Sequence, residues 1–163
     1  MEHDSVSFAV IGIIHTGHSD PKTAPIQPCY APESPGRVEL MPEYAEGLND
    51  IEGYSHLYLI YHHHRAEKKG LTVKPCLLDE KRGVFSTRVP GRPNPIGLSI
   101  VRLLSREGTV LHIAGADMLD GTPLLDIKPY SRRIDCITDT RNGWQDSIAD
   151  EQAMFHGSRG GLH

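Results

Sequence analysis

The apolar runs Leu98-Ser99-Ile100-Val101-Arg102-Leu103-Leu104 and Val110-Leu111-His112-Ile113-Ala114 decide the fold class, together with the residues Ser105-Arg106-Glu107-Gly108 between them. Both runs are short and contain β-branched residues, which is typical of strands. The linking residues include a glycine, which indicates a hairpin turn. The sequence therefore predicts a β-hairpin in a chain that is rich in strands.

Further short elements are predicted on both sides of this hairpin. Strands are expected at Val6–Ile14, Arg37–Met41 and Ser55–His63, with shorter candidates at Leu71–Cys76 and Val84–Thr87. A short helix is expected to begin at Pro42, because proline suits the first helical position, and another around Trp144–Met154. Residues 15–36 hold five prolines and are expected to form a long loop of the kind that often has a function.

Length and charge exclude several classes of protein. The 163 residues fit one domain, and 17 basic against 21 acidic side chains give a net charge of −4. This charge excludes a broadly basic nucleic-acid binder. Residues 65–92 nevertheless carry eight basic and three acidic side chains, whereas residues 1–64 carry two and nine. A basic stretch therefore lies within an acidic chain.

Several common signatures are absent from the sequence. No apolar run is long enough to cross a membrane, and the first residues lack the pattern of a signal peptide. The three cysteines, at 29, 76 and 136, form neither a disulfide framework nor a zinc knuckle, which predicts a cytoplasmic protein. No glycine-rich G-x-G-x-x-G turn follows the first predicted strand, so a Rossmann fold is not expected.

The segment Thr87–Ser99 has the most unusual composition in the chain. Three prolines and two glycines restrict its backbone, and the guanidinium groups of Arg88 and Arg92 extend from it. Guanidinium groups on a rigid loop suit planar anions such as carboxylate or phosphate. The alternative is a proline-rich connector with solvated arginines.

The segment Asp117–Tyr130 contains a strong turn signal, Asp120-Gly121-Thr122-Pro123. In a strand that follows this turn, Asp126, Lys128 and Tyr130 would share one face. These three groups could transfer protons, or they could form a surface ion pair of little energetic weight.

The run His62-His63-His64 is compatible with a metal pair, but no third ligand stands at a diagnostic spacing. We therefore expect no metal site there, and a histidine that contacts a ligand or the edge of the core instead. Gln27, in the long early loop, could bind an amide or adenine edge or could simply be solvated.

Taken together, these stretches resemble the TsaA-like (TrmO, or YaeB-like) family of tRNA methyltransferases. The resemblance covers residues 8–130 and depends on several motifs that occur in the family's order. These are Gln27-Pro28, Glu52–Leu57, Gly83–Arg88, Arg92–Ser99, Asp120–Pro123 and Leu125–Tyr130.

The resemblance implies a mainly β fold: a single compact β-barrel-like domain with a few short helices, expected here at residues 1–135 and followed by a partly irregular extension at 136–163. It implies S-adenosyl-L-methionine as the cofactor and N6 of N6-threonylcarbamoyladenosine at tRNA position 37 as the methylated atom. It also implies a homodimer with the cofactor near the subunit interface.

The family's functional residues transfer to matching positions of this chain. Cofactor contacts are expected at Gln27, Pro28, His64, Arg65, Arg88, Leu98, Asp117, Leu119, Asp120, Gly121 and Thr122. Substrate contacts are expected at Arg92, Asn94 and Lys128. Asp126 and Tyr130 are the candidate catalytic residues, because loss of a proton from N6 would activate that nitrogen.

Two other functions stay open at this point. The chain could be a cofactor-binding regulatory module without catalysis, since Gly91 stands where the family often has an aromatic residue. It could also methylate a small molecule or another RNA, which its acidic net charge favours. If tRNA is the substrate, the basic stretch predicts a positive rim at the pocket that includes Lys68, Lys69, Lys74, Lys81, Arg82 and Arg92.

Overall fold

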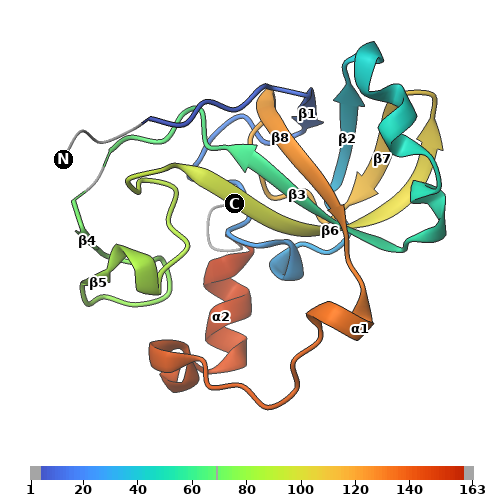
Figure 1. Cartoon of the computed structure of the whole chain (residues 1–163). Helices are drawn as coiled ribbons and strands as arrows, with labels where there is room; N and C mark the ends of the chain where they lie inside the picture. The colour runs from blue at the N-terminus through green and yellow to red at the C-terminus, as the bar shows by residue number, and fades with distance from the viewer. Residues whose placement is uncertain (1–4, 69, 160–163) are drawn as a thin grey trace.

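A computed structural model describes residues 5–68 and 70–159, and its centre is a closed six-stranded barrel (Figure 1). The strands follow the order β1-β2-β7-β6-β3-β8 around the barrel, and every neighbouring pair is antiparallel. They span Gly12–Thr16 (β1), Pro35–Leu40 (β2), His56–His62 (β3), Ile96–Glu107 (β6), Val110–Ala114 (β7) and Thr122–Pro129 (β8). The predicted mainly β, barrel-like fold is confirmed.

Smaller elements lie outside the barrel. A two-stranded sheet pairs β4 (Thr72–Val73) with β5 (Arg82–Gly83), and the two α-helices are α1 (Arg132–Asp135) and α2 (Asp150–Gly157). Short 3-10 helices span Pro28–Tyr30, Pro42–Leu48, Ile51–Gly53, Val84–Ser86 and Gly143–Ser147. Figure 1 shows β4, β5, α2 and α1 below the long strands β3 and β6.

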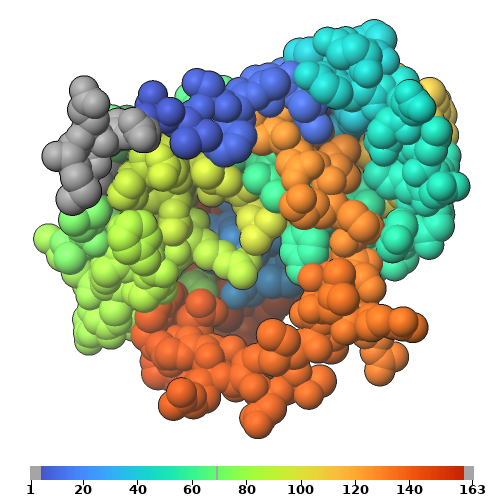
Figure 2. Space-filling view, viewed as in Figure 1, coloured from blue at the N-terminus to red at the C-terminus, as the bar shows by residue number. Residues whose placement is uncertain are grey.

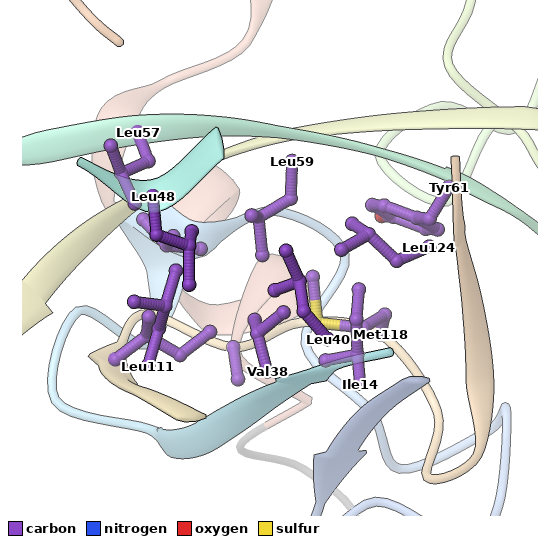
Figure 3. Close-up of a cluster of buried hydrophobic side chains, with 13 residues drawn as sticks. Ile14, Val38, Leu40, Leu48, Leu57, Leu59, Tyr61, Leu111, Met118 and Leu124 are labelled. Atoms are coloured by element: carbon purple, nitrogen blue, oxygen red, sulfur yellow. The ribbon is translucent and has the colours of Figure 1, made fainter. Parts of the chain in front are cut away.

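The barrel forms because apolar residues alternate along its strands. In β3, Leu57, Leu59 and Tyr61 are buried, whereas the residues between them are partly exposed. Alternation with a period of two directs one set of side chains inward. Figure 3 shows the resulting cluster, to which every strand of the barrel contributes. The core is therefore the barrel interior itself.

The predicted central hairpin is present as β6 and β7, but its turn is shorter than expected. The strand β6 continues through Ser105, Arg106 and Glu107, so that only Gly108 and Thr109 remain in the turn. Gly108 has φ +61°, a conformation that glycine adopts without steric cost. The strand also has a register shift between Leu103 and Ser105, which accommodates an extra residue.

Two predicted strands were wrong in part or completely. The first strand begins at Gly12 rather than Val6, because β2 ends at Leu40 and β8 pairs only with β3 beyond Leu124. Val84–Thr87 contains a 3-10 helix instead of a strand. Its turn is closed because the backbone N–H and the hydroxyl of Thr87 both donate to the carbonyl of Val84.

Other boundaries also differ from the prediction. Only Thr72–Val73 of the predicted Leu71–Cys76 strand pairs with another strand. The helix predicted around Trp144–Met154 consists of two elements, the 3-10 turn Gly143–Ser147 and the helix α2. Among the described residues, no helix is long and apolar enough to cross a membrane.

Candidate functional site

A cavity of about 1040 Å³ lies beside the barrel, where β3 ends and β6 begins. Its wall combines the loop that contains Gln27, the segment after β3, the proline-rich loop before β6 and the segment Asp117–Thr122. Residues of the C-terminal segment complete it, among them Trp144 and Arg159. Figure 2 shows a deep hollow on this side, between the segment around residue 90, the segment around residue 130 and the C-terminal residues.

Most of the residues predicted to contact cofactor or substrate meet at this cavity. Those that line it are Gln27, His64, Arg65, Arg88, Arg92, Asn94, Leu98, Asp117, Leu119 and Thr122. Those that do not line it are Pro28, Asp120, Gly121, Asp126, Lys128 and Tyr130. Loops from four parts of the sequence therefore converge on one site.

The candidate catalytic residues Asp126 and Tyr130 lie on the outer face of the barrel, beside the cavity. Asp126 pairs with Ile60 on β3, and Ile60 pairs with Leu98 on β6, which lines the cavity. Two strand spacings place Asp126 about 10 Å from Leu98 on the same face. The Asp126 carboxylate accepts from the Lys128 ammonium at 2.8 Å, as the predicted shared face allows.

Tyr130 lies just beyond β8 and packs against other aromatic rings. Its ring centroid is 5.8 Å from that of Tyr58 and 6.4 Å from that of His56. Its backbone N–H donates to the carbonyl of His56. Tyr130 therefore belongs to an aromatic group on the outer face of the barrel.

Three polar side chains form a chain of hydrogen bonds on the inner wall of the cavity. The hydroxyl groups of Tyr61 and Ser99 are 2.9 Å apart, and Ser99 Oγ donates to Asp117 Oδ1 at 2.6 Å. Burial raises the pKa of the Asp117 carboxyl to about 7, although the Ser99 hydrogen bond lowers it. Burial also raises the pKa of Tyr61, so that its hydroxyl stays protonated. Asp117 is thus a carboxyl group that a nearby positive charge would ionise.

Arginines supply the positive charge of the cavity. The guanidinium of Arg88 donates to Gln27 Oε1 at 3.0 Å, which joins the proline-rich loop to the long early loop. Arg92 donates to the carbonyl of Thr87, and Arg65 donates to the carbonyl of Ser19. These bonds hold the guanidinium groups in place, and their remaining N–H donors suit an anionic ligand.

The three consecutive histidines have different environments. His63 lines the cavity and packs against the Tyr61 ring at 5.1 Å. Burial lowers its pKa to about 4, with the charges of His62 and Arg92 acting in the same direction, so it is neutral at pH 7. Burial also lowers the pKa of His64. Within residues 5–68 and 70–159, no three His, Cys, Asp or Glu side chains are grouped to hold a metal ion.

Comparison with known proteins identifies the family. Residues 13–136 match the model of the tRNA-methyltransferase O N-terminal domain. The chain belongs to this family. It is 54% identical over 139 residues to a "probable S-adenosyl-L-methionine-binding protein" of Pyrococcus abyssi (strain GE5 / Orsay), which covers 85% of this chain and 76% of the relative.

Two further tRNA-methyltransferase O relatives support this membership. A protein of Escherichia coli (strain K12) named tRNA (adenine(37)-N6)-methyltransferase is 32% identical over 161 residues, or 92% of this chain and 68% of that protein. The crystal structure of TrmO from Pseudomonas aeruginosa has a TM-score of 0.77 and 39% identity. The match covers 91% of this chain and 66% of the solved chain, so this chain spans about two thirds of that protein's length.

The predicted positive rim is only partly present in this member of the tRNA-methyltransferase O family. Arg92 lines the cavity, but Lys68, Lys74, Lys81 and Arg82 do not. Lys74 forms an ion pair with Asp79, and Arg82 forms one with Glu80, both around the β4–β5 sheet. The prediction is wrong for these four side chains, and for Lys74 and Arg82 the reason is the acidic partner that each one has near the small sheet. Lys69 lies outside the described residues.

Sequence reasoning assigned no role to several residues that line the cavity, among them Tyr61, Phe85 and Trp144, nor to Ser99, which links Tyr61 to Asp117 without lining the cavity itself. Ser99 carried a usable signal, because it is the polar residue at an inward position between Gly97 and Val101 in an apolar strand. Trp144 carried none, since residues 131–163 show no clear periodicity. The family match also ends before Trp144.

Proposed function

We propose that this chain is an S-adenosyl-L-methionine-dependent methyltransferase that acts on N6 of N6-threonylcarbamoyladenosine at position 37 of tRNA. The convergence of the family's motif residues on one cavity carries this proposal. Relatives named as S-adenosyl-L-methionine-binding proteins and as tRNA (adenine(37)-N6)-methyltransferase support the cofactor and the general reaction. The cavity volume of about 1040 Å³ is close to the upper end of the range for ligand pockets, about 300–1,000 Å³.

The residues of the cavity fit this cofactor. Asp117 offers a carboxyl group to a positively charged part of the cofactor, and Arg88 offers a guanidinium to a carboxylate. Leu98 and Leu119 add apolar surface. When bound, the cofactor supplies an electrophilic methyl group on a sulfonium.

This chain's residues would contribute mainly by orientation. Holding two reacting groups in line can supply about 7–11 kcal/mol of the barrier. Arg92 and Asn94 line the cavity near its proline-rich edge and are our candidates for contacts to the RNA. Asp126 or Tyr130 would accept the N6 proton from a substrate that extends about 10 Å from Leu98 across the outer face of the barrel.

We also propose that the protein is a homodimer. The outward residues Ile96, Leu98 and Ile100 are 40–45% exposed on β6, next to the cavity. A second copy that covers them would place the cofactor near the interface. Light scattering would report the mass of a dimer, and Ile100→Lys would lower that mass to that of a monomer.

Mass spectrometry of tRNA nucleosides tests the reaction. The expected product is a methylated N6-threonylcarbamoyladenosine that appears only when protein and cofactor are both present.

Asp117→Asn would weaken cofactor affinity roughly ten- to a hundredfold in a calorimetric titration, because hydrogen bonds to charged groups contribute about 1.5–3 kcal/mol. Asp139→Asn is the matched control, since Asp139 is exposed and does not line the cavity.

The position of Asp126 and Tyr130 outside the cavity favours a second candidate, a cofactor-binding regulatory module without catalysis. Cofactor binding without any methylated nucleoside would support this candidate over the enzyme. If Asp126→Asn and Tyr130→Phe both keep full turnover, neither residue is the base.

A further inference from the structure

Two aromatic side chains at the mouth of the cavity have no role in the function proposed above. Phe85 is 75% exposed although it lines the cavity, and Trp144 lines it from the C-terminal segment. They are neighbours, because the indole N–H of Trp144 donates to the carbonyl of Ser86 at 2.8 Å. In the part of the chain that the structure describes, neither ring belongs to a close aromatic pair.

The turn that carries Trp144 is braced from within. Asp146 accepts from the backbone N–H of Asn142 at 3.1 Å and from its side-chain amide at 2.8 Å. Ser147 Oγ donates to the carbonyl of Trp144 at 2.7 Å. The indole is therefore held at the cavity before any ligand arrives, which lowers the entropic cost of binding.

The rest of the C-terminal segment is hydrogen-bonded to the early loop of the cavity wall. The N–H of Ile26 donates to the carbonyl of Gly157 at 3.0 Å, and Arg159 Nε donates to the carbonyl of Ala24 at 3.2 Å. Gly157 lies directly on the Tyr30 ring, where a β-carbon would be 2.4 Å from the ring atoms. Residues 142–159, which we name the C-terminal strap, thus pack against the long early loop at two points.

The two aromatic side chains at the mouth are more exposed to solvent than the side chains in the inner part of the cavity. Tyr61 and Thr122 are buried at its inner wall, whereas Phe85 is among the most exposed apolar side chains of the described residues. A small cofactor is normally buried over most of its surface, so it belongs to the inner part. A base that stays attached to a large RNA has to enter through the mouth, so side chains there are placed to contact it. Accessible aromatic rings in a cavity that arginines also line are what unstacked bases of single-stranded RNA bind.

We infer that Phe85 and Trp144 form a stacking site for the RNA base that is to be methylated, with the C-terminal strap supplying half of it. This inference rests on the proposed function, because it takes RNA as the substrate. The strap lies beyond the family match at residues 13–136. The family model therefore implies no substrate contact in the strap.

The chain provides its own reporter for this site, since Trp144 is its single tryptophan. The full chain is titrated with tRNA and, separately, with S-adenosylhomocysteine, while the tryptophan emission is recorded. Stacking of a base on the indole is expected to quench the emission on addition of tRNA. Complete quenching by S-adenosylhomocysteine alone, with no further change from tRNA, would assign the ring to the cofactor and overturn the inference.

Four variants separate a stacking role from a structural one. Trp144→Ala and Phe85→Ala should each raise KM for tRNA roughly five- to a hundredfold, as base stacking predicts, with cofactor affinity unchanged. Trp144→Phe keeps a ring but loses the bond to Ser86, so it should retain most of the activity. Phe155→Ala is the matched control, because Phe155 is 55% exposed on the strap and does not line the cavity.

The outcomes distinguish this inference from the proposed function. If the wild-type chain methylates tRNA but Trp144→Ala and Phe85→Ala leave KM unchanged, only the stacking site fails. If Trp144→Phe is as impaired as Trp144→Ala, the residue acts through its N–H anchor and the inference is overturned. If no methylation occurs, the proposed function fails. In that case quenching of the Trp144 emission by tRNA would still support the stacking site, and an unchanged emission would overturn it.

Discussion

The barrel and the cavity wall are held together in different ways. Each barrel strand pairs with both neighbours along a ladder of hydrogen bonds, and the interior is filled by apolar side chains. The wall consists of loops that are joined by individual hydrogen bonds, such as the one from Arg88 to Gln27 and the one from Trp144 to Ser86. Substitutions in the barrel should therefore change the free energy of unfolding, whereas substitutions in the wall should change binding.

The largest effect is expected inside the barrel. Leu59 is fully buried among the core side chains shown in Figure 3, so Leu59→Ala leaves a cavity. Truncation of a buried leucine costs about 2–5 kcal/mol, which urea unfolding would measure. Leu71→Ala is the control, because Leu71 is 66% exposed, and it should have little effect. Equal losses in both variants would contradict the distinction between barrel and wall.

A smaller effect is expected where the two regions meet, at Gly97. A β-carbon there would be 2.1 Å from the Tyr61 ring, and Tyr61 is the first member of the hydrogen-bonded chain to Asp117. Overpacking of this kind costs about 1–3 kcal/mol. Gly97→Ala should therefore lower both the free energy of unfolding and the affinity for cofactor.

Gly83→Ala is the matched control for this substitution, since nothing lies within 4 Å of a β-carbon at Gly83. It should change neither the unfolding curve nor a calorimetric titration with S-adenosyl-L-methionine. If Gly97→Ala reduces stability but leaves cofactor affinity unchanged, the Tyr61–Ser99–Asp117 chain does not link the barrel to the site.

The same contrast explains what the sequence could predict. The hairpin of β6 and β7 and the strand β3 were predictable, because alternation and short apolar runs are local signals. Val6–Ile11 was predicted as strand from the same signal and is not one, because β2 ends at Leu40 and β8 pairs only with β3 beyond Leu124. The end of a barrel strand depends on partner strands that are distant in the sequence, so a local run of residues does not predict it.

The site was predictable only where it repeats the family's motifs. Arg88, Asp117 and Gln27 were named from sequence, and all three line the cavity. Trp144 was not, because its place depends on one hydrogen bond to Ser86, 58 residues earlier in the chain. A contact of that kind leaves no periodic pattern in the sequence.

The smallest effect concerns pH, because two groups of the cavity oppose each other. The pKa of Asp117 rises from its ordinary 3.8 to about 7 on folding, so the folded state holds a proton that the unfolded state has lost. Asp117 therefore makes stability fall as pH rises from about 4 to 7. The pKa of His63 falls from 6.5 to about 4, so the unfolded state binds the extra proton. His63 makes stability rise over nearly the same pH range.

Single variants should reveal the two opposing slopes. In Asp117→Asn the contribution of His63 is uncompensated, so the melting temperature should increase with pH between about 4 and 6.5 more steeply than in the wild type. In His63→Gln the contribution of Asp117 is uncompensated, and the melting temperature should decrease relative to the wild type over the range from about 4 to 7. Thermal melts at closely spaced pH values would show both trends. If the melting temperature depends on pH in both variants as it does in the wild type, burial does not shift the pKa of Asp117 or of His63 as described.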